Sequence, residues 1–214
     1  MTRVRPMGPD DIERVQAVEV DAGARFREVP EPRIAACADH PPFPSDELRA
    51  FAEAGRAWVF EVDGVVVGFV LAEEVDGCGH IEELAVARSH GGRGIATALI
   101  DGVAQWAIAQ GLAALTLTTF RDVAWNRPLY ERRGFRVLAD DEVTEGLRTK
   151  VAEEEDYGLP PELRVVMRRD LPGDGGGGEP DRLHRDGVEH ELHVGDTGGI
   201  DSGQHVGQGG EGDG

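Results

Sequence analysis

Residues 84–100 constrain the fold of this chain more than any other segment. They read LAVARSHGGRGIATALI, in which a short apolar run ends in a glycine-rich loop that opens directly into a segment with helical apolar spacing. A strand, a glycine loop and a helix N-terminus together form an anion site, because the loop N–H groups converge where the helix dipole is positive. Glycine lets the backbone approach a ligand closely, and Arg93 adds a charge suited to phosphate. The segment predicts a protein that holds a phosphate-bearing cofactor.

Two familiar phosphate-binding motifs do not fit this loop. A P-loop needs a lysine directly after its glycines, and Lys150 is the only lysine of the chain. A Rossmann fingerprint needs Gly-x-Gly-x-x-Gly and an acidic residue about 20 positions further on. Thr97 stands in place of the third glycine, and the position of the acidic residue falls near Leu115, within another apolar run. The sequence therefore excludes both nucleotide-binding motifs.

The same segment resembles the acetyl-CoA signature of the GNAT superfamily of N-acyltransferases, whose core is written Gln/Arg-x-x-Gly-x-Gly/Ala. Gly94 and Ala96 match its last two fixed positions, whereas Gly91 stands where Gln or Arg is expected. Because this departure removes a side chain but keeps the backbone N–H, we expect weaker pyrophosphate binding and not loss of the site. Residues 129–135 (LYERRGF) resemble the family's Leu/Phe-Tyr-x-x-x-Gly-Phe segment at the expected distance downstream. The resemblance covers about residues 1–170 and implies acetyl-CoA as the co-substrate.

Composition limits the partners of the chain. The 214 residues carry 41 acidic and 22 basic side chains, a formal net charge of −19. Nucleic-acid binding needs clustered Lys and Arg, so no nucleic-acid partner is expected. The acidity is compatible with attraction of cationic amines, although acidic surfaces mostly serve solubility.

Cysteines and apolar runs limit the compartment. Cys37 and Cys78 are the only cysteines and form no Cys-x-x-Cys pair, so neither a zinc site nor a disulfide framework is indicated. Residues 1–6 lack the apolar region of a signal peptide, and no apolar run approaches the length that crosses a bilayer. We expect a soluble cytoplasmic protein with no metal and no membrane partner; a homodimer is left open.

The composition changes sharply after residue 172. Residues 173–214 hold half of the 30 glycines and no Phe, Trp or Tyr. Such a segment buries too little apolar surface to offset its ordering entropy. The sequence therefore predicts an acetyltransferase domain at residues 1–172 and a disordered acidic tail at 173–214. Metal binding is the alternative for the tail, which holds four of the seven histidines: His184, His190, His193 and His205.

Residues 1–172 predict an α+β fold of the GNAT type, with a central twisted mixed sheet of about six to seven strands and flanking helices. The predicted strands are residues 2–6, 57–62, 65–72, 80–86, 115–120, 136–138 and 163–168. The predicted helices are residues 10–24, 33–38, 45–54, 95–110, 126–133 and 143–155. Asp63-Gly64 is a strong hairpin signal between the second and third strands. The resemblance implies that the sheet splays between the strand ending at Val86 and the strand starting near Leu115, where the pantetheine arm lies.

Acetyl transfer to an amine needs a base for the ammonium proton, donors for the oxyanion and a proton for the leaving thiolate. The resemblance implies a base on the strand before the glycine loop, with Glu82 as the first candidate and His80 as the second. Because side chains alternate along a strand, His80 and Glu82 should share a face. Glu83 should oppose them and serve a structural role, unless the strand is bulged. The alternative for Glu82 and His80 is that they are surface or ion-paired residues with no catalytic role.

Tyr130 is the predicted acid, because the family places a tyrosine at this helical position near the sulfur; packing beside Phe135 is the alternative. Many relatives carry a cofactor-binding Asn seven residues before this tyrosine, and Val123 holds that place here. Asn126 either substitutes for it or caps the helix. The predicted cofactor-binding residues are Leu84, Ala85, Val86, Gly91, Gly92, Arg93, Gly94, Ile95, Ala96, Thr97 and Asn126. Backbone N–H groups near residues 84–86 are expected to stabilise the oxyanion.

The acceptor site is the least determined part. Its candidates are Phe26, Phe120 and Trp125, together with Arg25 and Arg121, and core packing is the alternative for the aromatic residues. Residues 120–126 resemble a bacterial subgroup of unassigned substrate. The predicted function is acetyl-CoA-dependent acetylation of a primary amine on a small molecule, by direct attack in a ternary complex. The alternatives are a protein N-terminal or lysine acetyltransferase and a non-catalytic acetyl-CoA-binding module.

Overall fold

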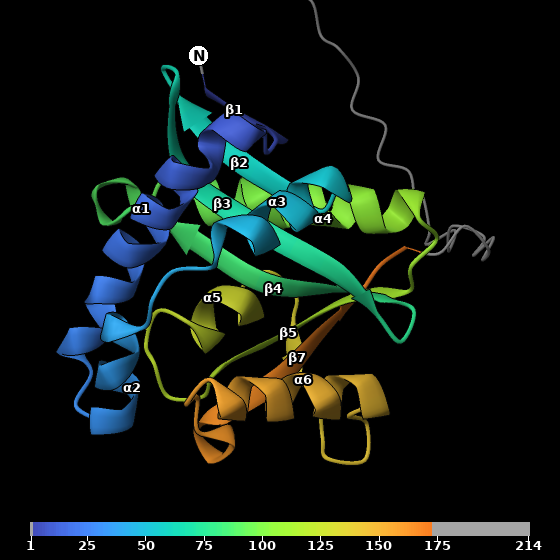
Figure 1. Ribbon diagram of the computed structural model, residues 1–214. Coiled ribbons are helices and arrows are strands. Elements are labelled where there is room, and N and C mark those ends of the chain that lie inside the picture. Colours follow the sequence, from blue (N-terminus) through green and yellow to red (C-terminus); the bar gives the residue numbers. More distant parts are fainter. Residues whose placement is uncertain (1, 173–214) are drawn as a thin grey trace, which may run out of the picture. The chain divides into compact units, whose positions relative to one another are not determined.

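A computed structural model describes residues 2–172, and the predicted tail at 173–214, with its histidines, lies outside them. The described residues form a seven-stranded sheet in the order β1-β2-β3-β4-β5-β7-β6 (Figure 1). Its strands are β1 (Thr2–Pro6), β2 (Ala57–Val62), β3 (Val65–Val75), β4 (Cys78–Val86), β5 (Ala114–Phe120), β6 (Arg136–Val137) and β7 (Arg164–Asp170). Neighbouring strands are antiparallel, apart from the parallel pair β4 and β5. The predicted mixed sheet is confirmed.

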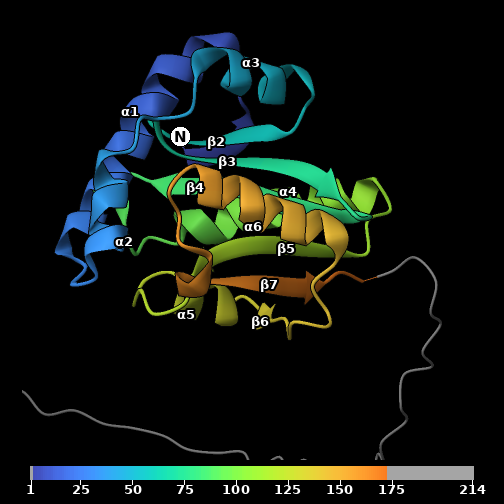
Figure 2. The ribbon, with the colours of Figure 1, turned by 60° about the horizontal axis from the view of Figure 1, so that its bottom comes forward.

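Helices cover both faces of this sheet. Helix α4 (Ile95–Ala109) lies on one face, and α6 (Glu145–Asp156) crosses the other face in front of β5 and β7 (Figure 2). Helices α1 (Ile12–Gly23) and α3 (Ser45–Glu53) lie on the same face as α6, over β2 and β3. Two short helices, α2 (Pro32–Ala36) and α5 (Arg127–Glu131), complete the set. No helix within residues 2–172 is both long and apolar enough to span a membrane.

The core on the α4 face explains why the glycine loop has a fixed place. Leu99, Ile100 and Val103 of α4 are fully buried against β3, β4 and β5. Helix α4 comes close to the sheet because Gly68 has no side chain: an added Cβ would lie 3.1 Å from Ile95 Cγ2 and 3.2 Å from the Ala85 carbonyl oxygen. This close approach anchors the first turn of α4 directly beside the end of β4.

The predicted hairpin at Asp63-Gly64 is confirmed. Asp63 and Gly64 have φ values of 49° and 82°, which fits the turn with two positive φ angles that matches the twist of the flanking strands. The turn fixes the register of β2 against β3, and so places α1 and α3 over their shared face.

Strand β4 contains a bulge at Glu82. Leu71 of β3 lies opposite Glu83, whereas the next residue, Ala72, lies opposite Ile81, so Glu82 is one extra residue in β4. Ile81 and Leu84 consequently both pack in the core on the α4 face. Glu82 and Glu83 between them both leave that face. The expectation that Glu83 opposes Glu82 is therefore wrong, because a bulge breaks the alternation on which it rested.

Strands β4 and β5 pair over only three residues. Gly79, His80 and Ile81 lie opposite Leu115, Thr116 and Leu117. Beyond them β4 continues to Val86 and β5 to Phe120 without pairing with each other. We call this region, residues 82–86 and 118–120, the splay. It leaves strand-edge backbone groups of β4 without a neighbouring strand, at the end of β4 that leads into the glycine loop.

Candidate active site

The glycine loop forms a cradle of free backbone donors at the start of α4. Gly92 and Gly94 have φ values of 74° and 80°, a conformation that side chains other than glycine rarely adopt. Within residues 2–172, the six N–H groups from Gly92 to Thr97 have no hydrogen-bond acceptor. They lie at the positive end of a 15-residue helix. This donor set fits a pyrophosphate group.

The other residues of the loop do not depend on a positive φ, and one of them fixes the loop to α1. The backbone of Gly91 has φ −58° and ψ 150°, which any residue adopts, and an added Cβ would lie 3.4 Å from the Arg88 carbonyl oxygen. Its conformation therefore does not require glycine. Arg93 is exposed and has no partner within the described residues. Arg88 fixes the loop to α1, because its N–H and Nε donate to the Asp21 carboxylate at 2.7 and 3.1 Å.

The splay continues this line of donors along β4. The Ala87 N–H donates to the Val67 carbonyl of β3 at 2.9 Å. Successive N–H groups of a strand point to opposite edges, so the N–H of Val86 points toward β5, into the splay. The Leu84 N–H acts to lower the pKa of the Glu83 carboxyl group. Leu84, Ala85 and Val86 thus border the place where an extended chain would run from the cradle.

Glu83 is the carboxylate at the centre of the splay. Burial raises its pKa to about 7, while the charge of Arg164 and the Leu84 N–H act in the opposite direction. Within residues 2–172 Glu83 forms no salt bridge. Glu19 of α1 faces it: burial, together with the Glu83 charge, raises the Glu19 pKa to about 8. A carboxyl group with a pKa near 7 changes its protonation state at physiological pH, as a general base must.

Glu82, by contrast, is engaged by α6. The Lys150 ammonium lies 3.1 Å from its Oε2, 2.6 Å from Glu73 and 3.1 Å from Glu153. Burial raises the pKa of Glu82 against the opposing effect of Lys150. Burial acts in the same direction on Glu73, but the hydrogen bond and charge of Lys150, together with the hydrogen bond to Glu82, outweigh it and lower the pKa of Glu73. These contacts attach α6 to β3 and β4 next to the splay.

His80 lies deeper in the sheet. Its Nδ1 is 3.0 Å from the Thr116 hydroxyl, and the residue is 1% exposed. Burial, assisted by the Lys150 charge, lowers its pKa to about 4, so the imidazole is neutral at pH 7. His80 belongs to the part of β4 that still pairs with β5, before the splay begins.

Tyr130 approaches the splay from α5. Its ring lies edge-on to Phe135, with the centroids 5.8 Å apart. Burial, with the charge of Glu83, raises the pKa of its phenol well above the usual range, so the hydroxyl keeps its proton. Asn126 precedes α5 at the N-cap position, but its side chain makes no capping hydrogen bond. The amide of Asn126 therefore stays available to a ligand.

The three aromatic candidates come together where β5 ends, at Phe120 in the splay. The Phe26 ring packs edge-on against Phe120 at 5.5 Å and lies 6.2 Å from Trp125. Phe120 is only 2% exposed and forms a small core with Ile34 and Val123. Phe26 and Trp125 are half-buried, and Arg25 lies over the Trp125 ring at 4.0 Å. Phe120 is thus a core residue, and Phe26 and Trp125 cover it on the side that faces solvent.

The comparison with family models decides the family. Residues 24–135 match the model of the acetyltransferase (GNAT) family. The chain belongs to the GNAT family. The match includes the glycine cradle, the splay and the Tyr130 segment. Solved structures agree in fold. A PaiA N-acetyltransferase from Thermoplasma acidophilum, in complex with coenzyme A, has a TM-score of 0.61 at 13% identity and covers 80% of this chain and 99% of its own.

Other GNAT structures of similar fold act on different acceptors. The ribosomal-protein-S18-alanine N-acetyltransferase from Escherichia coli has a TM-score of 0.57 at 14% identity, covering 83% of this chain and 98% of its own. The N-acetylglutamate synthase from Neisseria gonorrhoeae, with coenzyme A and N-acetyl-glutamate, has a TM-score of 0.59 at 17% identity, covering 80% and 35%. At these identities the likeness concerns the fold alone.

Sequence reasoning missed three charged residues around the splay of this GNAT domain. Arg164 of β7 binds Glu154 of α6 at 2.7 Å and the Thr118 hydroxyl at 2.8 Å. Lys150 and Glu19 were missed as well. The only signal for Lys150 was its being the sole lysine of an acidic chain, and no local pattern marks the others. Within residues 2–172, no cluster of three His, Cys, Asp or Glu is arranged to hold a metal ion.

Proposed function

We propose that the protein transfers an acetyl group from acetyl-CoA to the primary amine of a small molecule, by direct attack in a ternary complex. The observation that carries the proposal is the continuity of the cradle with the splay. Six free N–H groups at Gly92–Thr97 suit a pyrophosphate, and the open edge of β4 suits the extended pantetheine chain. Arg93 and the amide of Asn126 would add contacts at the two ends of this line. When bound, acetyl-CoA supplies the activated acetyl group.

Glu83 is the general base of this proposal, with Glu82 as the second candidate. Its pKa of about 7 lets it accept the ammonium proton at neutral pH. Glu82 was the first candidate from the sequence, and burial raises its pKa to about 7 as well, but its carboxylate is held in an ion pair by Lys150 at 3.1 Å. His80 has a structural role in this proposal, because its hydrogen bond to Thr116 joins β4 to β5.

Tyr130 is the general acid. Its phenol keeps its proton at neutral pH, and the thiolate of coenzyme A needs one on leaving. The Val86 N–H, which points into the splay, is the proposed oxyanion donor. Such a donor is effective because it is already oriented before the charge develops.

The acceptor would enter between α1 and α6, where Glu19 and Glu83 lie. The ionised form of Glu83 favours a cationic amine, the carboxyl group of Glu19, with a pKa of about 8, can accept a hydrogen bond from it, and the exposed sides of Phe26 and Trp125 would contact an apolar part of it. Helix α6, attached by Lys150, borders the same region and leaves less room for a folded protein acceptor. A small amine is therefore favoured over a protein N-terminus or lysine.

The test follows thiol release from acetyl-CoA with a panel of polyamines, arylalkylamines, amino acids and peptides. We expect turnover with small cationic amines, and a loss of about 10²- to 10⁴-fold in kcat for Tyr130→Phe and for Glu83→Gln. The matched control is Tyr157→Phe, at a tyrosine that is 70% exposed, which should leave the rate unchanged.

Three outcomes would contradict parts of the proposal. Turnover with peptides alone would assign a protein acceptor. Saturable binding of acetyl-CoA without turnover across the panel would assign a non-catalytic binding module. A larger loss in Glu82→Gln than in Glu83→Gln would move the base to Glu82.

A further inference from the structure

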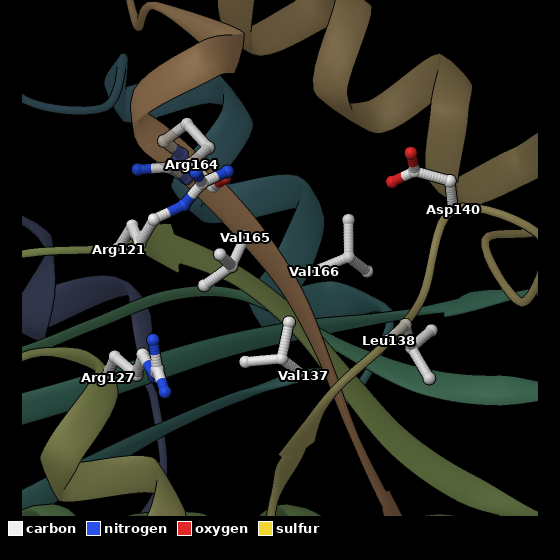
Figure 3. A pocket seen from close by; sticks show the side chains of 8 residues that line it. All are labelled: Arg121, Arg127, Val137, Leu138, Asp140, Arg164, Val165 and Val166. Atoms are coloured by element: carbon white, nitrogen blue, oxygen red, sulfur yellow. The ribbon is translucent and has the colours of Figure 1, made fainter.

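A second candidate binding site lies at the outer edge of the sheet, beside β6 and β7. Three arginine side chains lie on one side of a pocket of about 360 Å³, and Asp140 lies apart from them at its other end (Figure 3). Val137 and Val165 line it from the α4 face of the sheet, and Leu138 and Val166 line it from the α6 face. The pocket therefore combines a cationic side with an aliphatic lining, in a protein whose formal net charge is −19.

The pocket exists because β6 is very short. Its two residues, Arg136 and Val137, lie opposite Arg168 and Met167 of β7, and the Leu138 N–H then donates to the Val166 carbonyl at 2.9 Å. The outer edge of β7 before that point has no strand beside it. Arg121, directly after β5, and Arg127, at the start of α5, border this uncovered edge.

Each arginine keeps donor atoms for a ligand. Arg164 uses Nε and Nη2 on Glu154 and Thr118, and its Nη1 has no partner within residues 2–172. Arg127 uses Nε on Glu131 at 2.7 Å, which leaves both terminal nitrogens. Arg121 contacts only a carbonyl oxygen, that of Arg164, at 3.4 Å. Guanidinium groups with free terminal nitrogens are suited to the two oxygens of a carboxylate.

The charge balance selects among anions. Glu154 and Glu131 already neutralise Arg164 and Arg127, and Asp140 lies at the far end of the pocket (Figure 3), so Arg121 is the one arginine of the three without an ion pair in the described residues. A single arginine without an ion pair, in a pocket that also holds Asp140, matches a monoanion better than a phosphate dianion. The aliphatic lining adds affinity only for a ligand that carries an apolar chain.

We propose that this pocket binds the carboxylate of a short aliphatic monocarboxylic acid, with the carboxylate at Arg121 and Arg127 and the chain along Val137 and Val165. The paired β5 and β7 strands lie between the aliphatic part of the pocket and the splay, while Arg164 belongs to both through its hydrogen bond to Thr118. The proposal concerns binding of the acid and does not rest on the acetyl-transfer reaction.

The test titrates the full-length protein with hexanoate and follows the resonances of the protein and of the ligand by NMR. We expect saturable binding with a Kd on the order of 1 mM. Acetate should bind more weakly, by up to about fourfold for each methylene group removed. Hexanamide, which keeps the chain but lacks the charge, and inorganic phosphate should both bind at least about tenfold more weakly.

Variants locate the site. The double variant Arg121→Ala/Arg127→Ala should weaken hexanoate binding at least about tenfold. The control Arg49→Ala removes an exposed arginine of α3 and should change nothing. Equal binding of hexanoate and hexanamide, equal binding of hexanoate and phosphate, unchanged binding by a folded double variant, or no binding to the wild-type protein would each overturn the proposal. The ligand series on the wild-type protein decides the matter even if the double variant does not fold.

Discussion

Replacement of Lys150 by methionine tests how α6 is held on the sheet. The ammonium of Lys150 lies within 3.1 Å of three carboxylates, and two of these, on Glu73 and Glu82, are close to each other on β3 and β4. Methionine keeps most of the aliphatic stem but removes the charge. Two half-buried carboxylates are then left facing each other without a cation.

The magnitude follows from burial. Breaking a fully buried ion pair costs about 3–5 kcal/mol. The side chains of Lys150, Glu73 and Glu82 are 17, 25 and 23% exposed, so solvent screens part of this interaction. We expect the free energy of unfolding to fall by about 2–3 kcal/mol at pH 8. With a urea m-value of about 2 kcal/mol per M, the midpoint moves down by about 1–1.5 M.

The loss should depend on pH in a definite direction. In the wild-type protein the pKa of Lys150 is raised and that of Glu73 is lowered, so their stabilisation is present above the unfolded pKa of Glu and below that of Lys. In the variant, the carboxylates repel each other and take up protons more readily. The destabilisation should therefore be smaller at about pH 5.5 than at about pH 8.

Urea unfolding of both proteins, followed by far-UV circular dichroism at the two pH values, measures this difference. The control is Arg27→Met, which removes an ion pair of 2.6 Å between side chains that are 57 and 73% exposed; it should cost no more than about 0.5 kcal/mol. Unchanged stability of Lys150→Met at pH 8, or a larger loss at pH 5.5 than at pH 8, would refute the reasoning.

Three other outcomes concern the proposed active site. Gly94→Ala places a Cβ at φ 80° and should destabilise the protein by about 1–2 kcal/mol and weaken coenzyme A binding by calorimetry; wild-type values for both would contradict the role of the positive φ. Gly91→Gln restores the side chain that the family signature expects, on a backbone that accepts it, and should tighten coenzyme A binding about three- to tenfold; equal or weaker binding would contradict this. The kcat/KM for the best amine should rise with pH through an inflection near 7, because the Glu83 pKa is about 7. Glu83→Gln should lose this inflection, and its persistence would exclude Glu83 as the base.

The strands, the long helices and the glycine loop could be predicted from the sequence because their signals are local. Helix α4, for example, follows from apolar spacing bounded by Gly94 and Gly111, and it is observed at Ile95–Ala109. Turn chemistry at Asp63-Gly64 was equally local. Such signals depend on a few neighbouring residues, and tertiary contacts did not override them.

The arrangement of charges around the splay could not be predicted in this way. Alternation along β4 gave the wrong side for Glu83, because the bulge at Glu82 depends on how β3 pairs with β4. Lys150 lies 77 and 68 positions from Glu73 and Glu82 in the sequence, and Arg164 meets Thr118 through the pairing of β5 and β7. These contacts follow from topology and carry no short-range pattern.

The bulge at Glu82 also sets the phase of everything that follows it in β4. If β4 paired with β3 regularly through Glu82, without the bulge, residues 83–86 would each lie on the face of the sheet opposite to the one they now occupy. Leu84 and Val86 would leave the core on the α4 face, where they now pack, and the glycine loop would start about 3.3 Å further along the strand direction, out of place for the first turn of α4. The extra residue thus shifts the side-chain alternation of β4 by one position. Because of this shift, β4 packs apolar side chains under α4 on both sides of the bulge and still presents two adjacent carboxylates between them.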